Sequence, residues 1–161
     1  MSSTNRGAIR KPMDFYATPE TAFKPLLPYL PKNMKYWEPS CGDGRLIKWL
    51  NEYGCEADGT DLSLGKDFLK DTKKRSFIIT NPPFSLAQEF CDHALNLSPE
   101  VIMLLRVNFL GSQKRKVWWQ THEPSALFVL SKRPDFTGGG GDSCEYAWYY
   151  WGKRFTGIKH I

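Results

Sequence analysis

The fold class is decided by one stretch, MKYWEPSCGDGRLIKWLNEYG at residues 34–54. Its first five residues form a short apolar run that predicts a strand, and the next residues form a turn with two glycines. After Gly44 the apolar residues follow helical spacing, and Gly54 then supplies a residue suited to a helix C-cap. A strand, a glycine-rich turn and a helix in this order are typical of α/β proteins.

The rest of the chain continues this alternation. A helix is predicted after residue 84, where Ser85 and Gln88 have the spacing of a capping box, and the basic segment 108–122 is expected to be part helix and part loop. No helical pattern separates the last two predicted strands, so these should pair antiparallel. Further strands are predicted at 56–61, 77–80, 101–105, 126–131 and 144–151. We expect a three-layer α/β domain with a mostly parallel sheet and an antiparallel last strand.

Length and composition indicate one globular domain. A chain of 161 residues can bury one core, so a single domain over 1–161 is expected, with 1–13 flexible. The longest aliphatic run, 101–105, is far shorter than the roughly 20 residues that span a bilayer, which argues against a membrane protein. Residues 1–12 lack the apolar segment of a secretory signal, so a cytoplasmic location is expected.

The four cysteines do not indicate a metal centre or a disulfide framework. They stand at positions 41, 55, 91 and 144, without a CxxC pair. Cys91 and His93 are the one close Cys/His pair, and two ligands are too few for zinc. We expect reduced thiols and no metal.

Three features stand at the ends of predicted strands, where α/β proteins place their ligands. The first is the turn Glu38-Pro39-Ser40-Cys41-Gly42-Asp43-Gly44. Glycines after a strand let the backbone approach a ligand, and the following helix offers free N–H groups. An ordinary tight turn would have the same residues, so this feature alone is weak.

The second feature is Asp61, which closes the next predicted strand 17 residues after Gly44. A carboxylate at this position can accept hydrogen bonds from both hydroxyls of a ribose, and the spacing is near the roughly 20 residues typical of nucleotide sites. Acidic strand ends are common, so Asp61 acquires weight only beside the other two features.

The third feature is the tetrad Asn81-Pro82-Pro83-Phe84, directly after the strand 77–80. Two prolines stiffen the turn and remove two backbone donors, which leaves carbonyl groups free to accept. Asn81 adds a side-chain oxygen and Phe84 a flat apolar face. An acceptor pair beside a stacking surface suits a planar group that carries an NH2.

Together these motifs resemble the S-adenosylmethionine-dependent amino-methyltransferases, most closely the DNA adenine-N6 methyltransferases. The tetrad is similar to their catalytic motif and residues 38–44 to their cofactor motif. Residues 14–20, Asp-Phe-Tyr-Ala-Thr-Pro-Glu, are similar to an N-terminal motif of several subgroups, and Asp67-Phe68-Leu69 to the motif that holds the cofactor's adenine. The resemblance covers residues 14 to about 151 and implies a Rossmann-like class I methyltransferase fold.

The resemblance also implies roles for individual residues. Asn81, Pro82, Pro83 and Phe84 would be catalytic, with Asn81 Oδ1 and the Pro82 carbonyl accepting from the substrate amine and Phe84 stacking on the base. Phe136 would be a second ring near the base. The implied cofactor-binding residues are Tyr16, Thr18, Glu38, Pro39, Ser40, Cys41, Gly42, Gly44, Asp61, Leu62, Asp67, Phe68 and Asn81.

Two departures from the family pattern matter. Asp61 and Asp67 are only six positions apart, where the family usually fits a helix and a strand, so the role of Asp67 is less secure and one sheet element is expected to be missing. The chain also has no room for a separate target-recognition domain. Specificity must then reside in short elements, in a homodimer or in a partner subunit.

The net charge of +5 is concentrated between Arg106 and Arg133, a stretch with six basic residues and one acidic residue. Lys114, Arg115 and Lys116 are its densest part and are expected to bind the substrate, and Trp118 and Trp119 follow. Cations beside aromatic rings favour nucleic acid as the partner, and the family resemblance implies DNA rather than RNA. A solvated basic helix with tryptophans in the core is the alternative for this segment.

Three other functions stay open at this point. Similar tetrads occur in RNA adenine-N6 methyltransferases and in enzymes that methylate a glutamine side chain of translation factors. A methyltransferase fold retained as a binding module is the non-catalytic alternative. The residues Glu38–Gly42 favour the DNA group, the basic segment disfavours a protein substrate, and the intact motifs disfavour a module without activity.

Overall fold

The computed structural model describes residues 16–161, so the expected flexibility of 1–13 and the motif residues Asp14 and Phe15 lie outside the described residues. This part of the chain forms a seven-stranded sheet with the order β2-β1-β3-β4-β6-β5-β7. Strand β6 is antiparallel to both its neighbours, and the other neighbouring strands are parallel. The strands are β1 (Lys35–Glu38), β2 (Glu56–Gly59), β3 (Phe77–Thr80), β4 (Val101–Arg106), β5 (Ala126–Val129), β6 (Tyr146–Trp151) and β7 (Gly157–His160).

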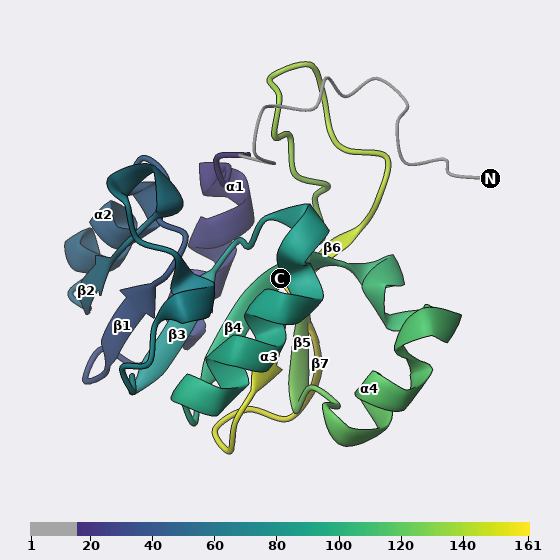
Figure 1. Ribbon diagram of the computed structural model, residues 1–161. Coiled ribbons are helices and arrows are strands. Elements are labelled where there is room, and N and C mark those ends of the chain that lie inside the picture. Colours follow the sequence, from purple (N-terminus) through teal and green to yellow (C-terminus); the bar gives the residue numbers. More distant parts are fainter. Residues whose placement is uncertain (1–15) are drawn as a thin grey trace.

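Helices cover both faces of the sheet, which confirms the expected three-layer α/β arrangement. The helices are α1 (Glu20–Phe23), which continues as a 3₁₀ helix over Lys24–Tyr29, α2 (Arg45–Glu52), α3 (Ala87–Leu97) and α4 (Lys116–Thr121). Figure 1 shows α3 in front of β4. Helix α4 lies at the right of the molecule, and α1 and α2 lie at the left.

Alternate residues of the central strand β4 enter two separate cores. Ile102 and Leu104 pack with residues of α1 and α2, whereas Met103 and Leu105 pack with residues of α3 and α4. All four side chains are at most 2% exposed. The sheet is therefore buried on both faces at its centre, as its continuous apolar strands predicted.

The stretch that predicted the fold adopts the expected strand, turn and helix. Strand β1 leads into the glycine turn, and Gly44 precedes α2 with a φ of 81°, in the left-handed region that favours glycine. Helix α2 then buries Leu46 and Leu50 against the sheet. The chain turns back toward β2 at Gly54, which also has a positive φ.

Strand β7 and helix α1 are elements that sequence patterning missed. The antiparallel strand is β6, which the sequence predicted to be the last, but β7 follows it and pairs in parallel with β5 at the sheet edge. Residues of β7 are mostly exposed, and Ile158 is 67% exposed. A short strand held mainly by backbone hydrogen bonds leaves no apolar alternation in the sequence.

The start of α3 also differs from the prediction. The α-helix begins at Ala87, after a 3₁₀ turn over Phe84–Leu86, and its N-cap residue Leu86 makes no side-chain cap. Ser85 lies inside this turn and not at the N-cap. The capping-box prediction was wrong because the tetrad carries the chain into a tighter turn before the helix starts.

The segment between Asp61 and β3 contains 3₁₀ turns at Leu62–Leu64 and Phe68–Lys70 and no strand. Strand β2 is consequently an edge strand, which agrees with the missing sheet element that the short spacing indicated. Within 16–161, no helix is long and apolar enough to span a membrane.

Replacement of Gly59 by Ala should destabilise the fold. A Cβ atom at Gly59 would lie 2.3 Å from the carbonyl oxygen of Glu38 and 2.9 Å from Cδ1 of Ile47. Overpacking of this kind costs about 1–3 kcal/mol. We expect urea unfolding of Gly59→Ala to show a loss of that size, whereas Gly139→Ala, whose nearest neighbour would be 3.6 Å away, should unfold like the wild type. Equal midpoints for the two variants would contradict this packing argument.

Candidate active site

A cleft of about 280 Å³ lies where the carboxyl ends of β1, β2 and β3 meet. Each of these parallel strands contributes the segment that follows it, so three motifs far apart in the sequence face one space. The predicted site residues that line the cleft are Tyr16, Thr18, Ser40, Cys41, Gly42, Asp61, Leu62, Asn81, Pro82, Pro83 and Phe84. Glu38, Pro39 and Gly44 belong to the same glycine loop but do not line the cleft.

Asp61 joins the second strand's end to the glycine loop. Its Oδ2 accepts a hydrogen bond from the backbone N–H of Gly42 at 3.1 Å, and its Oδ1 accepts from the N–H and the hydroxyl of Ser63. A carboxylate has about four lone-pair positions, so these three donors leave one open. The hydroxyl of Ser63 rotates freely and can release a second position to a ligand.

Asn81 is held by the segment that precedes α1. Its Nδ2 donates to the carbonyl of Tyr16 at 3.1 Å and to the hydroxyl of Thr18 at 3.2 Å. A carbonyl only accepts, so the NH2 group must face Tyr16 and the amide cannot be flipped. The opposite atom, Asn81 Oδ1, is buried without a hydrogen-bond partner. The site therefore holds an oriented and unsatisfied acceptor, which is rare in folded proteins.

The side chain of Thr18 is part of this arrangement and not a helix cap. Thr18 is 4% exposed and its hydroxyl accepts from Asn81, whereas α1 begins after Pro19 with no side-chain cap. Thr18 therefore contributes to the site through Asn81 and does not cap α1.

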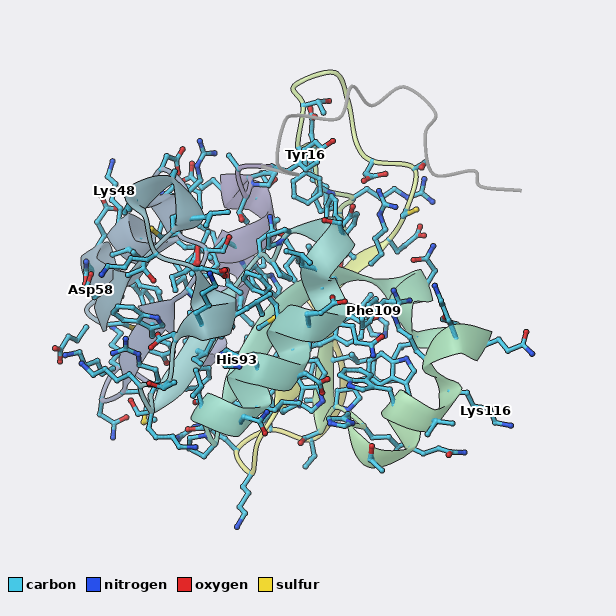
Figure 2. All side chains as sticks on the ribbon, in the orientation of Figure 1. Tyr16, Lys48, Asp58, His93, Phe109 and Lys116 are labelled. Carbon is cyan, nitrogen blue, oxygen red and sulfur yellow. The ribbon has the colours of Figure 1, made fainter. Side chains whose placement is uncertain are left out.

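Four aromatic rings form a cluster at the tetrad, and two of them, Tyr16 and Phe84, line the cleft. Tyr16 stacks on Phe84 with ring centroids 5.4 Å apart, and Phe136 contacts both rings edge to face at 6.1–6.2 Å. Tyr146, which is fully buried in β6, packs against Phe84 and Phe136 from below. Tyr16 and Phe136 come from opposite ends of the chain, and Figure 2 shows Tyr16 close to the long loop before β6. The structure thus brings the predicted Phe136 to the tetrad.

Arg45 is a cleft residue that sequence reasoning did not select. Its guanidinium group pairs with Asp43 at 2.7 Å and donates to the carbonyl of Thr18 at 3.3 Å, so it ties the glycine loop to the segment before α1. Arg45 lowers the pKa of Asp43 by hydrogen bonding. The sequence signal that could have selected Arg45 was its position as a basic residue at the start of the helix after the glycine turn.

Glu38 lies beneath the glycine loop with an orphaned oxygen. The side chain is 4% exposed, and its Oε2 has no hydrogen-bond partner. Burial raises the pKa of Glu38 well above its usual range, and the negative charges of Asp61 and Asp43 add to the shift. The neighbouring Thr80 side chain opposes part of this shift, and the carboxyl group is favoured in its neutral form.

Cys41 does not have the character of a nucleophile. Burial, together with the negative charge of Asp61, raises the pKa of its thiol to about 11, so the thiolate is scarce at neutral pH. Among the described residues, no group of three His, Cys, Asp or Glu side chains is arranged to hold a metal ion.

The structure does not bring Asp67 and Phe68 to the cleft. Asp67 Oδ1 accepts from the N–H of Leu69 and so caps a 3₁₀ turn, and Phe68 is buried against Phe90 and His93. Both residues line a separate depression, beyond Thr60. With no strand between Asp61 and Asp67, this motif cannot reach the same sheet edge as the other three.

The basic segment is divided between exposed and supported side chains. Lys114 and Lys116 are exposed, and Figure 2 shows Lys116 extending away from α4. Arg115 is half-buried, with its guanidinium 4.1 Å above the ring of Phe109. None of the ion pairs among residues 16–161 involves these three cations.

The two tryptophans beside this segment are packing residues. Trp119 is buried and donates to the carbonyl of Phe109, and Trp118 donates to Asp92 while its ring stacks on His122. Trp119 is therefore a core residue, which confirms the core alternative for this tryptophan, whereas Trp118 is half-buried and held by Asp92 and His122. Their indole N–H groups found acceptors on elements that sequence spacing did not place nearby.

Comparison with known proteins identifies the fold. No protein-family model and no curated protein sequence matches the chain. Among solved structures, it matches a protein of Pyrococcus horikoshii assigned as an RNA methyltransferase with a TM-score of 0.62 and 15% identity, over 89% of this chain and 88% of that one. It also matches a modification subunit assigned to a type I restriction enzyme of Vibrio vulnificus, with a TM-score of 0.64 and 12% identity over 91% of this chain.

A third match is a protein of Listeria monocytogenes assigned as a class I S-adenosylmethionine-dependent methyltransferase, with a TM-score of 0.52 and 14% identity over 88% of this chain. The chain spans 47% of the Vibrio protein and 61% of the Listeria protein. These likenesses show that the chain has the Rossmann-like class I methyltransferase fold, as the sequence resemblance implied.

The buried carboxyl group of Glu38 should give stability a distinctive pH dependence. Because its pKa is raised in the folded state, the unfolded chain loses this proton first, so stability falls as pH rises from about 4.3 toward the folded pKa. Across that window, the free energy of unfolding of Glu38→Gln should rise relative to that of the wild type, by up to about 1.4 kcal/mol per pH unit. The measurement is urea unfolding of both proteins from pH 4 to pH 8. A difference that does not change with pH would contradict the raised pKa.

Proposed function

We propose that this protein binds S-adenosylmethionine and transfers its methyl group to the exocyclic N6 amine of adenine in DNA. The observation that carries the proposal is Asn81 Oδ1, a buried acceptor without a partner whose orientation is fixed through Tyr16 and Thr18. A ligand that carries an N–H group can satisfy this acceptor with a hydrogen bond. The stacked rings beside it suit a planar donor such as adenine.

The cleft fits the proposed cofactor. Gly42 has a φ of 54°, in the left-handed region, so the loop can present backbone to a ligand where a side chain would be strained. Asp61 retains one open lone-pair position, and Ser63 can release another, for the two ribose hydroxyls. Tyr16, Thr18, Ser40 and Leu62 would complete the cofactor side. When bound, S-adenosylmethionine supplies an electrophilic methyl group on a sulfonium sulfur.

The tetrad would act on the amine. The amino nitrogen of adenine is a poor nucleophile because its lone pair is delocalised into the ring. Hydrogen bonds from its two hydrogens to Asn81 Oδ1 and to the Pro82 carbonyl would favour a pyramidal nitrogen and stabilise the positive charge that develops on it. Phe84 would hold the base near attack geometry by stacking, with Tyr16 and Phe136 supporting that ring.

A base that is paired inside a duplex cannot reach the buried acceptor Asn81 Oδ1. The target adenine must therefore be extruded or already unpaired. The chain spans 47% of the Vibrio modification subunit. Specificity is therefore proposed to come from short loops, from a homodimer or from a partner subunit.

RNA is the second candidate substrate, because the Pyrococcus protein that the chain matches over most of both lengths is assigned as an RNA methyltransferase. DNA ranks first through the motif Glu38–Gly42 and the second likeness, to a restriction-modification subunit. Transfer of a labelled methyl group to unmethylated DNA, RNA and protein in parallel, followed by nucleoside analysis, decides between them. The expected product is N6-methyladenine in DNA. Absence of transfer to all three would reject the enzymatic proposal.

Asp61→Ala should weaken binding of S-adenosylmethionine by about 1.5–3 kcal/mol, the scale for hydrogen bonds to a charged group. Isothermal titration calorimetry measures this directly. Asp58→Ala is the matched control, because it removes the same charge from an exposed position on β2 outside the cleft. If both variants bind like the wild type, Asp61 does not hold the ribose.

Asn81→Ala should lower the rate of methyl transfer at saturating cofactor by about 100-fold or more, beyond any change in cofactor affinity that follows from losing its hydrogen bonds to Tyr16 and Thr18. The variant loses an oriented acceptor at the centre where charge develops, and such groups contribute on this scale. Single-turnover rates and calorimetric cofactor titration separate the two effects. Wild-type turnover by this variant would remove the tetrad from the mechanism.

A further inference from the structure

A second groove adjoins the cleft across the ring of Phe84. It has a volume of about 330 Å³, and we call it the arginine groove after Arg106 and Arg115, which line it together with Phe84, Asn108 and Phe109. Phe84 lines the cleft as well, so a single aromatic ring separates the two spaces. A molecule that occupies the cleft and is longer than one nucleotide can continue past Phe84 into this groove.

Arg115 is fixed in the groove by an aromatic support. Its guanidinium lies 4.1 Å above the ring of Phe109, and that ring is wedged edge to face against Trp118, Trp119 and Tyr149. The N–H of Trp119 also donates to the Phe109 carbonyl at 3.1 Å. The tryptophans therefore hold the surface on which Arg115 rests. A cation that is positioned in advance loses less entropy when it binds an anion.

Arg106 stands on the other side of the groove with a different electrostatic character. Its guanidinium lies 5.2 Å from the Phe84 ring centroid, and it pairs with Asp142 at 3.5 Å and donates to the Tyr146 hydroxyl at 3.0 Å. Asp142 partly neutralises its charge, whereas Arg115 has no acidic partner among the described residues. The attraction of this groove for an anion thus comes mainly from Arg115.

We propose that the arginine groove binds a backbone phosphate of the nucleic-acid strand next to the target base. The inference rests on the proposed function, and it assigns the strand a path: the base enters the cleft beside Phe84, and the neighbouring phosphate lies between Arg115 and Arg106. Guanidinium groups suit this role because their planar N–H donors match phosphate oxygens. The exposed Lys114 and Lys116 lie outside the groove and make no fixed contact in this arrangement.

The test measures binding of a short single-stranded oligonucleotide with one adenine, by fluorescence anisotropy at several salt concentrations. Arg115→Gln, which keeps a long side chain over Phe109, and Arg115→Ala should each lower the log–log salt slope by roughly 0.7. When the salt concentration rises from 50 to 200 mM, the affinity of each variant should fall by a factor that is about threefold smaller than the factor for the wild type. Lys116→Ala is the matched control, since it removes one adjacent charge outside the groove, and its slope should stay that of the wild type.

The position of the phosphate is tested with oligonucleotides in which single phosphates near the adenine are replaced by neutral methylphosphonates. One replacement within two nucleotides of the adenine should weaken wild-type binding by severalfold and have no further effect on Arg115→Gln. An unchanged salt slope for both Arg115 variants, an equal effect of Lys116→Ala, or the absence of a coupled phosphate would each overturn the proposal. Neither readout depends on methyl transfer, so failure of the proposed activity would be seen separately.

Discussion

The arrangement of the site depends on the parallel hydrogen bonding of β1 with both β2 and β3. Parallel neighbours end at the same edge of a sheet, so the glycine loop, Asp61 and Asn81 are brought together although 43 positions separate Glu38 from Asn81 in the chain. The close approach of Gly59 to Glu38 is part of the same constraint, because any larger residue would push the two strands apart where the cleft begins.

Three hydrogen bonds join the segment before α1 to this edge of the sheet. Asn81 donates to Tyr16 and Thr18, and Arg45 reaches the carbonyl of Thr18 from the glycine loop. The segment before α1 is thus attached to both motifs, and Tyr16 is placed against Phe84 as a consequence. The donors of Asn81 are used for structure, which leaves its acceptor oxygen for a ligand. A side chain held in this way is oriented before any substrate arrives, which is the condition for electrostatic stabilisation of a charge-developing atom.

In the arginine groove beside Phe84, aromatic rings support positively charged side chains. Around Arg106 and Arg115 the rings of Phe84, Phe109 and Tyr146 position guanidinium groups at the surface, and the tryptophans lie below them. Lys114 and Lys116 of this stretch are exposed, whereas Arg106 and Arg115 rest on aromatic rings. Of these four cations, Arg106 and Arg115 line the groove beside Phe84.

The amino-acid sequence alone determined the α/β class, the alternation of β1, α2, β3 and α3, and the three strand-end motifs, because these depend on local periodicity and turn chemistry. It also indicated a missing sheet element, since six residues after Asp61 cannot hold a helix and a strand. Edge strand β7, the turn before α3 and the departure of Asp67 from the cleft were decided by tertiary structure. So were the partners of Asn81, the contact of Phe136 with Phe84 and the burial of Trp119. Each depends on which residues distant in the chain meet in space, and one-dimensional spacing holds no information about those pairings.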